Sequence, residues 1–185
     1  MVKIMRIRFY NARVLTMDGD MGVDWGEVWV EGNRIVYVGD GNELKSDENG
    51  GNSDGTWVWD REIDVEGNLI MPGFANAHTH SAMTFLRSYA DDLPLQEWLQ
   101  KQVFPMEAKL TGEDIYDLSK LAILEYLTSG ITSNFDMYFQ PEMIARASVD
   151  CGFRTILVSS LNNFTSSLED MEREYQEYNN YHELI

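Results

Sequence analysis

The spacing of hydrophobic and polar positions predicts β-structure over residues 1–66. "RIRFYNARVL" alternates polar and apolar residues around Ile7 and Phe9, as in a half-buried strand. "EVWVEGNRIVYVGDG" places β-branched and aromatic runs on both sides of Gly32-Asn33, which predicts a hairpin. "TWVWDREIDVEG" resumes the β pattern. The polar stretch "KSDENGGNSDG" (45–55) has nothing to bury, so we expect a mobile loop there.

Residues 67–185 follow a different pattern, in which strands, loops and helices take turns. "LIMPGFANAH" has the composition of a short buried strand. In "LPLQEWLQKQVF" four apolar residues share one helical face: Leu95, Trp98, Leu99 and Val103. Thr111 and Asp114 form a capping-box pattern, and the helix that they begin is expected to end near Gly130.

Two more strand–helix pairs follow. "ITSNFDMYF" and "RTILVSSL" are predicted strands, with a helix from Pro141 to Gly152 between them. "SSLEDMEREYQEYNNYHELI" is predicted as a helix that runs to Ile185 without a stop signal. Strands that alternate with helices indicate parallel βα units. Three units cannot close a barrel of about eight strands, so we expect the chain to be part of a larger architecture.

Charge and composition narrow the possible partners. The chain has 31 acidic and 14 basic residues, a net charge of −17, which disfavours nucleic acids and anionic membrane surfaces as partners. No stretch reaches the roughly 18 apolar residues of a membrane span, and no secretory signal is apparent. The single cysteine, Cys151, is expected to be a small buried hydrophobe. These features suit a cytoplasmic protein.

Two of the three histidines lie in "PGFANAHTHSAM", as His78 and His80. Residues two apart on a strand project from the same face, so the two imidazoles suit a divalent metal such as zinc. Both rings must be neutral to bind it, and the metal affinity should fall on acidification. The alternative is a pair of hydrogen-bonded structural histidines. The third, His182, lies among polar residues and is expected at the surface.

A longer stretch, "LIMPGFANAHTHSAMTFLRSYADDLPLQEWLQKQVFPMEAKLT", resembles the signature region of the amidohydrolase superfamily. The resemblance is strongest to the branch of S-adenosylhomocysteine and methylthioadenosine deaminases, with chlorotriazine hydrolases as near relatives. It implies an α/β fold, a distorted (β/α)8 TIM barrel beside a small β-sandwich. Residues 1–66 would then supply sandwich strands, and residues 67–185 the first three βα units of the barrel.

The resemblance also implies a chemistry: metal-dependent hydrolytic deamination of an adenine nucleoside such as methylthioadenosine, adenosine or S-adenosylhomocysteine. His78 and His80 match the first-strand ligands of the metal, zinc or alternatively iron. Glu107 matches a carboxylate that accepts hydrogen bonds from two ribose hydroxyls; otherwise it is a solvated acid. Trp98 matches a wall of the substrate pocket, or simply packs on its helix face. Asp136 is expected to have a supporting role. The complete protein is expected to form a homo-oligomer.

Some features of the family pattern have no counterpart in these 185 residues. The H-x-x-E histidine and glutamate, a further histidine and a late aspartate are absent, so no catalytic residue is assigned here and the chain alone is expected to be inactive. "LVSSLNNFTSS", with Ser159 and Ser160, holds no arginine to grip a substrate carboxylate. Two alternatives stay open: a chlorotriazine-type or other heterocycle amidohydrolase, and a non-enzymatic remnant or binding module.

Overall fold

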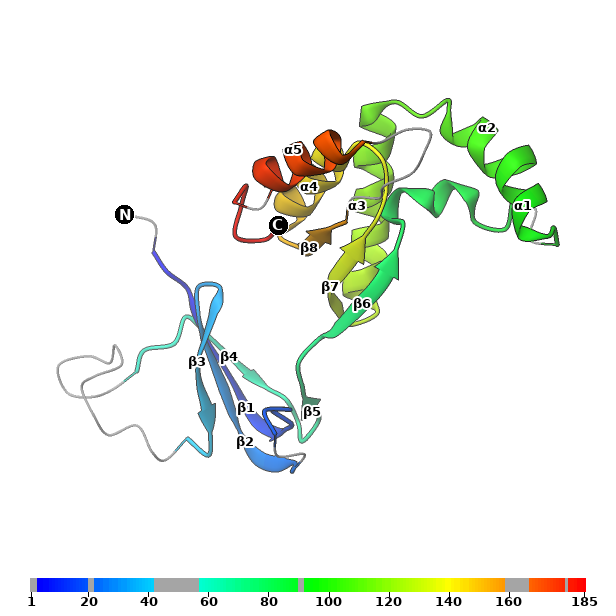
Figure 1. Cartoon of the computed structure of the whole chain (residues 1–185). Coiled ribbons are helices and arrows are strands. Elements are labelled where there is room, and N and C mark those ends of the chain that lie inside the picture. Colours follow the sequence, from blue (N-terminus) through cyan, green and yellow to red (C-terminus); the bar gives the residue numbers. More distant parts are fainter. Residues whose placement is uncertain (1–2, 20–21, 42–56, 90–91, 159–166, 179) are drawn as a thin grey trace. The chain divides into compact units, whose positions relative to one another are not determined.

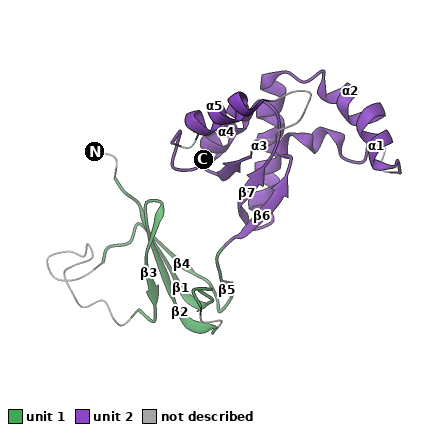
Figure 2. Cartoon of the chain, viewed as in Figure 1, with its two compact units in different colours: residues 1–72 green, residues 73–185 purple. Residues whose placement is uncertain are grey.

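A computed structural model of the chain describes most of the sequence (Figure 1). The described residues are 3–19, 22–41, 57–89, 92–158, 167–178 and 180–185. They form two compact units, residues 1–72 (unit 1) and residues 73–185 (unit 2), which are coloured separately in Figure 2. The predicted mobile loop at 45–55 and the residues Ser159 and Ser160 lie outside the described residues.

Unit 1 is built on one mixed sheet. Its strands are β1 (Arg6–Val14), β2 (Asp24–Glu31), β3 (Arg34–Gly39), β4 (Arg61–Asp64) and β5 (Leu69–Ile70). The order is β3-β2-β1-β4, with β5 also pairing with β1. The predicted hairpin is confirmed, since β2 and β3 pair antiparallel around Gly32, whose φ of 62° suits a glycine. Ala12, Val14 and Val28 form its core.

Two expectations for unit 1 need correction. Within the described residues from 57 onward, the predicted strand begins only at Arg61, and the rings of Trp57 and Trp59 pack against Trp29. The single strand predicted over residues 69–78 is two strands. Leu69 pairs with Arg13 of β1, and the first compact unit ends at Pro72. Pro72, which has no N–H to donate, separates β5 from the next strand.

Unit 2 contains a parallel sheet of β6 (Phe74–Thr79), β7 (Ile131–Asp136) and β8 (Arg154–Leu157), in that order. Helices α3 (Gly112–Thr128) and α4 (Pro141–Cys151) connect the strands, and α5 (Leu168–Tyr178) follows β8. Figure 1 shows α3 running behind β6 and β7. Tyr116, Ile123, Ala147 and Phe153 form a core between α3, α4 and the start of β8. The predicted βα alternation is confirmed.

Local signals fix most ends of these elements. Thr111 and Asp114 make the predicted capping box at the start of α3. Gly152, with φ 66°, ends α4 as predicted. The last helix, however, ends at Tyr178 and does not reach Ile185. The following backbone turns back to β8, where Leu184 O accepts a hydrogen bond from Thr155 N at 2.9 Å.

The predicted helix at residues 93–104 is present but irregular. It consists of α1 (Leu95–Trp98), a π-helical segment η3 (Leu99–Val103) and α2 (Phe104–Glu107) in direct succession. A π-helical turn inserts an extra residue and rotates the faces on either side of it. The predicted common face is therefore broken: Val103 is 1% exposed, whereas Leu95 is 63% exposed.

One face of the unit 2 sheet is less covered than its sequence suggests. The paired residues Phe135 and Ile156 are 43% and 51% exposed, and Phe74 is 59% exposed. The expectation of a buried strand at β6 is therefore wrong within the described residues, because α3 and α4 cover only the other face. Among the described residues, no helix is long and apolar enough to cross a membrane.

Candidate active site at the end of β6

The histidine pair lies where β6 ends. His78 is in the strand, and His80 immediately precedes the 3₁₀ helix η2 (Ser81–Leu86). The two ring centroids are 5.2 Å apart, with an interplanar angle of 78°. His78 is exposed and His80 is half-buried. The carboxyl ends of parallel strands are where ligands bind in α/β folds, so the pair occupies a position suited to a site.

A backbone hydrogen bond determines which nitrogen of His80 is free. His80 Nδ1 lies 2.5 Å from the carbonyl oxygen of Met137. A carbonyl only accepts, so Nδ1 carries the hydrogen, and in the neutral ring Nε2 has a lone pair to offer. Metal-binding imidazoles characteristically donate their second N–H in this way. The donor set and the tautomer therefore fit a divalent metal.

The backbone next to His80 is held by buried polar groups of β7. Ser81 N donates to Asp136 Oδ1 at 3.2 Å, and Asn134 Nδ2 lies 3.3 Å from Asp136 Oδ2. Asp136 is 1% exposed. Burial raises the pKa of its carboxyl, against the opposing effect of the hydrogen bonds from Ser81. Asp136 therefore contacts the loop that carries His80.

Glu107, the last residue of α2, is hydrogen-bonded to Tyr138. The tyrosine hydroxyl donates to Glu107 Oε1 at 2.7 Å. The pKa of Tyr138 is raised, mainly by burial and secondly by the nearby Glu107 carboxylate. The Tyr138 ring centroid is 6.4 Å from that of His80. The carboxylate is thus connected to the histidine pair through one aromatic side chain.

Sequence reasoning did not identify Tyr138 or the Met137 carbonyl. The available signal was their position, because Met137 and Tyr138 directly follow Asp136 at the carboxyl end of β7. The hydrogen bond between His80 and the Met137 carbonyl could not be predicted from the sequence, because the two residues are 57 positions apart along the chain.

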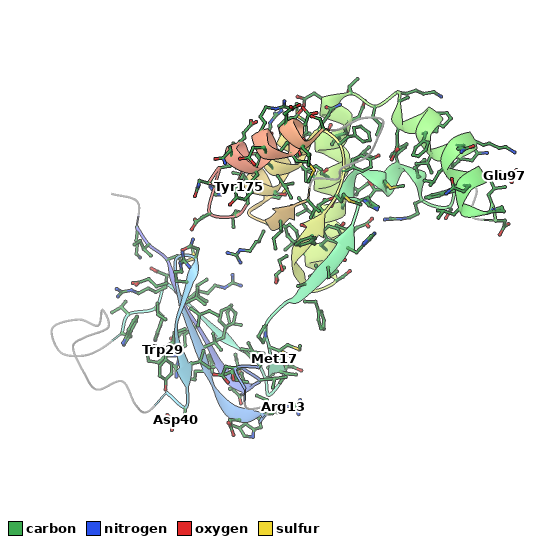
Figure 3. The ribbon with its side chains drawn as sticks, viewed as in Figure 1. Arg13, Met17, Trp29, Asp40, Glu97 and Tyr175 are labelled. Atoms are coloured by element: carbon green, nitrogen blue, oxygen red, sulfur yellow. The ribbon has the colours of Figure 1, made fainter. Side chains whose placement is uncertain are left out.

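Two pockets adjoin these residues. One, of about 400 Å³, is lined by His80 together with Trp98, Thr79 and Tyr126, so Trp98 and His80 share a cavity. Trp98 Nε1 donates to Tyr89 O at 3.4 Å. The other, of about 490 Å³, is lined by Tyr138, by Ile156 and by residues of α5 that include Tyr175, which Figure 3 labels.

The two histidines are not joined by a third ligand of the usual kinds. Within the described ranges, no group of three or more His, Cys, Asp and Glu side chains is placed to hold a metal. Hydrolytic zinc sites use three protein ligands and leave one position open. The described residues therefore contain two candidate ligands of such a site.

Comparison with known proteins gives a consistent result. The model of the amidohydrolase family matches residues 69–184. Over 181 residues the chain is 37% identical to a 5-methylthioadenosine/S-adenosylhomocysteine deaminase of Caldicellulosiruptor saccharolyticus, covering 98% of this chain and 39% of that protein. Over 152 residues it is 45% identical to a 5'-deoxyadenosine deaminase of Methanosarcina mazei, covering 82% of this chain and 32% of that protein.

Solved structures are similar as well. An adenosine deaminase from Xanthomonas campestris with bound zinc superposes with a TM-score of 0.75 at 27% identity, covering 97% of this chain and 40% of that one. A zinc complex of atrazine chlorohydrolase from Arthrobacter aurescens shares the fold. It superposes with a TM-score of 0.73 at 21% identity, covering 96% of this chain and 43% of that one. The chain thus spans about two fifths or less of the curated relatives. With its family model matched over residues 69–184, this chain belongs to the amidohydrolase family.

Proposed function

We propose that this chain supplies two metal ligands and part of the substrate pocket of a metal-dependent aminohydrolase that acts on an adenine nucleoside. The observation that carries the proposal is the hydrogen bond from His80 Nδ1 to Met137 O, which leaves Nε2 available beside His78. The deaminase names of the relatives support the substrate class. In this proposal β6, β7 and β8 are the first three strands of a (β/α)8 barrel.

His78 and His80 would hold zinc, with iron as the second choice, through neutral imidazole nitrogens. Bound there, the metal supplies a water molecule whose pKa is lowered to about 7, so that a nucleophile is available at neutral pH. The whole protein would exchange the amino group of the purine for the oxygen of water, with ammonia as the leaving group. The further ligands and the proton-transferring glutamate that the family pattern requires are not among these 185 residues, so the activity is proposed for the whole protein.

Glu107 would bind the ribose. One carboxylate oxygen accepts from Tyr138 at 2.7 Å, and the lone pairs that remain on the two oxygens can accept from a vicinal diol. Glu107 is half-buried, so these hydrogen bonds would form in a partly desolvated site, where a charged acceptor contributes more than at an open surface. Trp98, in the same cavity as His80, would provide an apolar wall for the purine.

The sequence favours a substrate without a carboxylate tail, because no arginine lies between Arg154 and Arg173. Adenosine, methylthioadenosine and 5'-deoxyadenosine satisfy this condition, whereas S-adenosylhomocysteine brings an amino-acid group that needs a cationic partner.

The test is ammonia release by the whole protein from adenosine and methylthioadenosine, measured as isolated, after chelation, and after zinc is restored. We expect activity that chelation abolishes and zinc recovers. No release under any of these conditions, or release that chelation leaves unchanged, would refute the proposal. Turnover of a chlorotriazine without turnover of nucleosides would favour the heterocycle hydrolase instead.

A further inference from the structure

A tyrosine on helix α3 contacts both neighbours of His80. The hydroxyl of Tyr126 lies 2.5 Å from Thr79 Oγ1 and 3.1 Å from Ser81 Oγ. A phenol can donate one hydrogen bond and accept another, so a single hydroxyl satisfies both contacts. The residues on either side of a candidate metal ligand are thereby attached to the same point on a helix.

The network continues from Ser81 into β7. Asn134 Nδ2 donates to Ser81 Oγ at 3.2 Å, and Ser81 N donates to Asp136 Oδ1 at 3.2 Å. Ser81, Asn134 and Asp136 are all at most 3% exposed. Buried hydrogen bonds of this kind restrict the backbone, because a group that loses its partner has no water to replace it.

Thr79 and His80 are also attached to the end of β7 through hydrogen bonds to the backbone of Met137. Met137 N donates to Thr79 O at 3.1 Å, while Met137 O accepts from His80 Nδ1. The ring of Tyr126 stacks on Phe153 with centroids 5.6 Å apart, and this contact restricts how the ring can turn. Tyr126 is therefore a rigid link from the helix layer to the loop that carries His80.

We propose that Tyr126 is a positioning residue for a divalent cation, one that keeps His80 Nε2 in the direction needed for coordination. It does not touch the cation itself; it acts through Thr79 and Ser81. This inference rests on the proposed function, because it assumes that His78 and His80 are ligands. Groups that orient a ligand typically change metal affinity by about 10- to 100-fold when they are removed.

The test compares the zinc affinity of the parent protein with that of Tyr126→Phe. Both are prepared as metal-free whole protein, and the affinity is measured by competition with a chromogenic chelator. The substitution keeps the ring on Phe153 and removes only the hydroxyl. We expect about 10-fold weaker binding or more. The visible spectrum of the cobalt-loaded protein should also change, because it reports ligand geometry.

A matched control separates positioning from general stability. Ser148 Oγ and Thr155 Oγ1 form another buried hydroxyl pair in unit 2, 2.7 Å apart, between α4 and β8. We expect Ser148→Ala to lower the melting temperature of the metal-free protein about as much as Tyr126→Phe does. Its zinc affinity and cobalt spectrum should stay as in the parent. Equal losses of affinity in both variants would overturn the proposal, since a structural role would then suffice.

Thr79→Val provides a second route if Tyr126→Phe folds poorly. It removes the other side of one of the two hydrogen bonds, so Thr79→Val should by itself weaken zinc binding. Where Tyr126→Phe folds, the double variant should bind zinc only slightly more weakly than Tyr126→Phe alone. Fully additive losses would overturn the proposal. Tight zinc binding by the parent with unchanged binding by Tyr126→Phe would refute this inference alone. If the parent protein binds zinc no more tightly than His80→Ala does, the proposed function is refuted as well.

Discussion

In unit 1 the charged side chains of the sheet satisfy one another, whereas at the end of β6 in unit 2 a polar atom is left available. Arg8 Nε donates to Glu27 Oε2 at 2.8 Å and Arg8 Nη1 donates to Glu62 Oε2 at 2.9 Å. Trp29, labelled in Figure 3, adds a hydrogen bond to Glu27 from its indole nitrogen at 2.8 Å. His80 uses only Nδ1 in its bond to Met137 O.

The difference distinguishes a structural polar cluster from a candidate binding site. Cross-strand ion pairs neutralise each other and leave little to offer a ligand. A neutral imidazole that is fixed by one nitrogen keeps the other as a donor for a metal. The relevant signal in unit 2 is therefore an oriented ring with a free lone pair, rather than a concentration of charge.

The largest effect is expected for His80→Ala. Loss of the ligand should weaken zinc binding by more than about 100-fold, beyond the effect of removing an orienting group, and should abolish ammonia release from adenosine. His182→Ala is the matched control, because His182 is exposed and lies after α5. Equal zinc affinity in the two variants, measured by competition titration, would contradict the assignment of His80 as a ligand and with it the contrast between the end of β6 and the ion pairs of unit 1.

Glu107→Gln should reduce kcat/KM on ribonucleosides by about 10- to 100-fold, the equivalent of about 1.5–3 kcal/mol for hydrogen bonds to a charged group. A heterocyclic substrate without a diol should be processed as before. Glu113→Gln is a suitable control, since Glu113 forms an exposed ion pair with Arg146. Equal losses on both kinds of substrate would contradict the ribose assignment and favour the heterocycle hydrolase.

Glu27→Gln should destabilise unit 1 by about 1–2 kcal/mol at neutral pH. Burial tends to raise the pKa of Glu27, but the hydrogen bonds from Arg8 and Trp29 outweigh it and lower that pKa. A lowered pKa stabilises the fold above the ordinary glutamate pKa, and this contribution is lost as the pH falls through the folded-state value.

The difference in melting temperature between Glu27→Gln and the parent should accordingly shrink below about pH 4. Glu62→Gln, at a side chain that is 48% exposed, should have a smaller effect. Zinc affinity should be unchanged, because Arg8, Trp29 and Glu27 all belong to unit 1. A pH-independent difference would show that the ion pair does not account for the loss.

The smallest effect is expected for Thr111→Ala at the start of α3. Removing the capping hydroxyl should cost about 1 kcal/mol in the free energy of unfolding, read from denaturant titration. Thr128→Ala, at the other end of α3, should change it by less than about 0.5 kcal/mol. A loss at Thr128 as large as that at Thr111 would contradict the role of the capping box.

The sequence predicted the elements whose signals are local. The hairpin around Gly32, the capping box at Thr111 and the helix between Pro141 and Gly152 all depend on residues a few positions apart. The assignment of Leu69–Ile70 to the first sheet could not be predicted, because it depends on pairing with β1. The end of α5 at Tyr178 similarly depends on the return of Leu184 to the edge of β8.

The candidate site was predicted only in part for the same reason. The spacing of His78 and His80 indicated a shared face, and the family resemblance singled out Glu107 and Trp98. The partners that orient them come from distant positions: Met137 for His80, and Tyr138 for Glu107, which are 57 and 31 residues away along the chain. Nothing in the pattern of helix α3 distinguishes Tyr126 from its other aromatic residue, Tyr116.

The most direct test of the proposed metal site is anomalous diffraction at the zinc edge from crystals of the whole protein. One strong peak is expected about 2.0–2.1 Å from His80 Nε2 and from a ring nitrogen of His78, with the hydrogen bond from His80 Nδ1 to Met137 O preserved. A peak elsewhere in the molecule, or coordination of His80 through Nδ1, would contradict it.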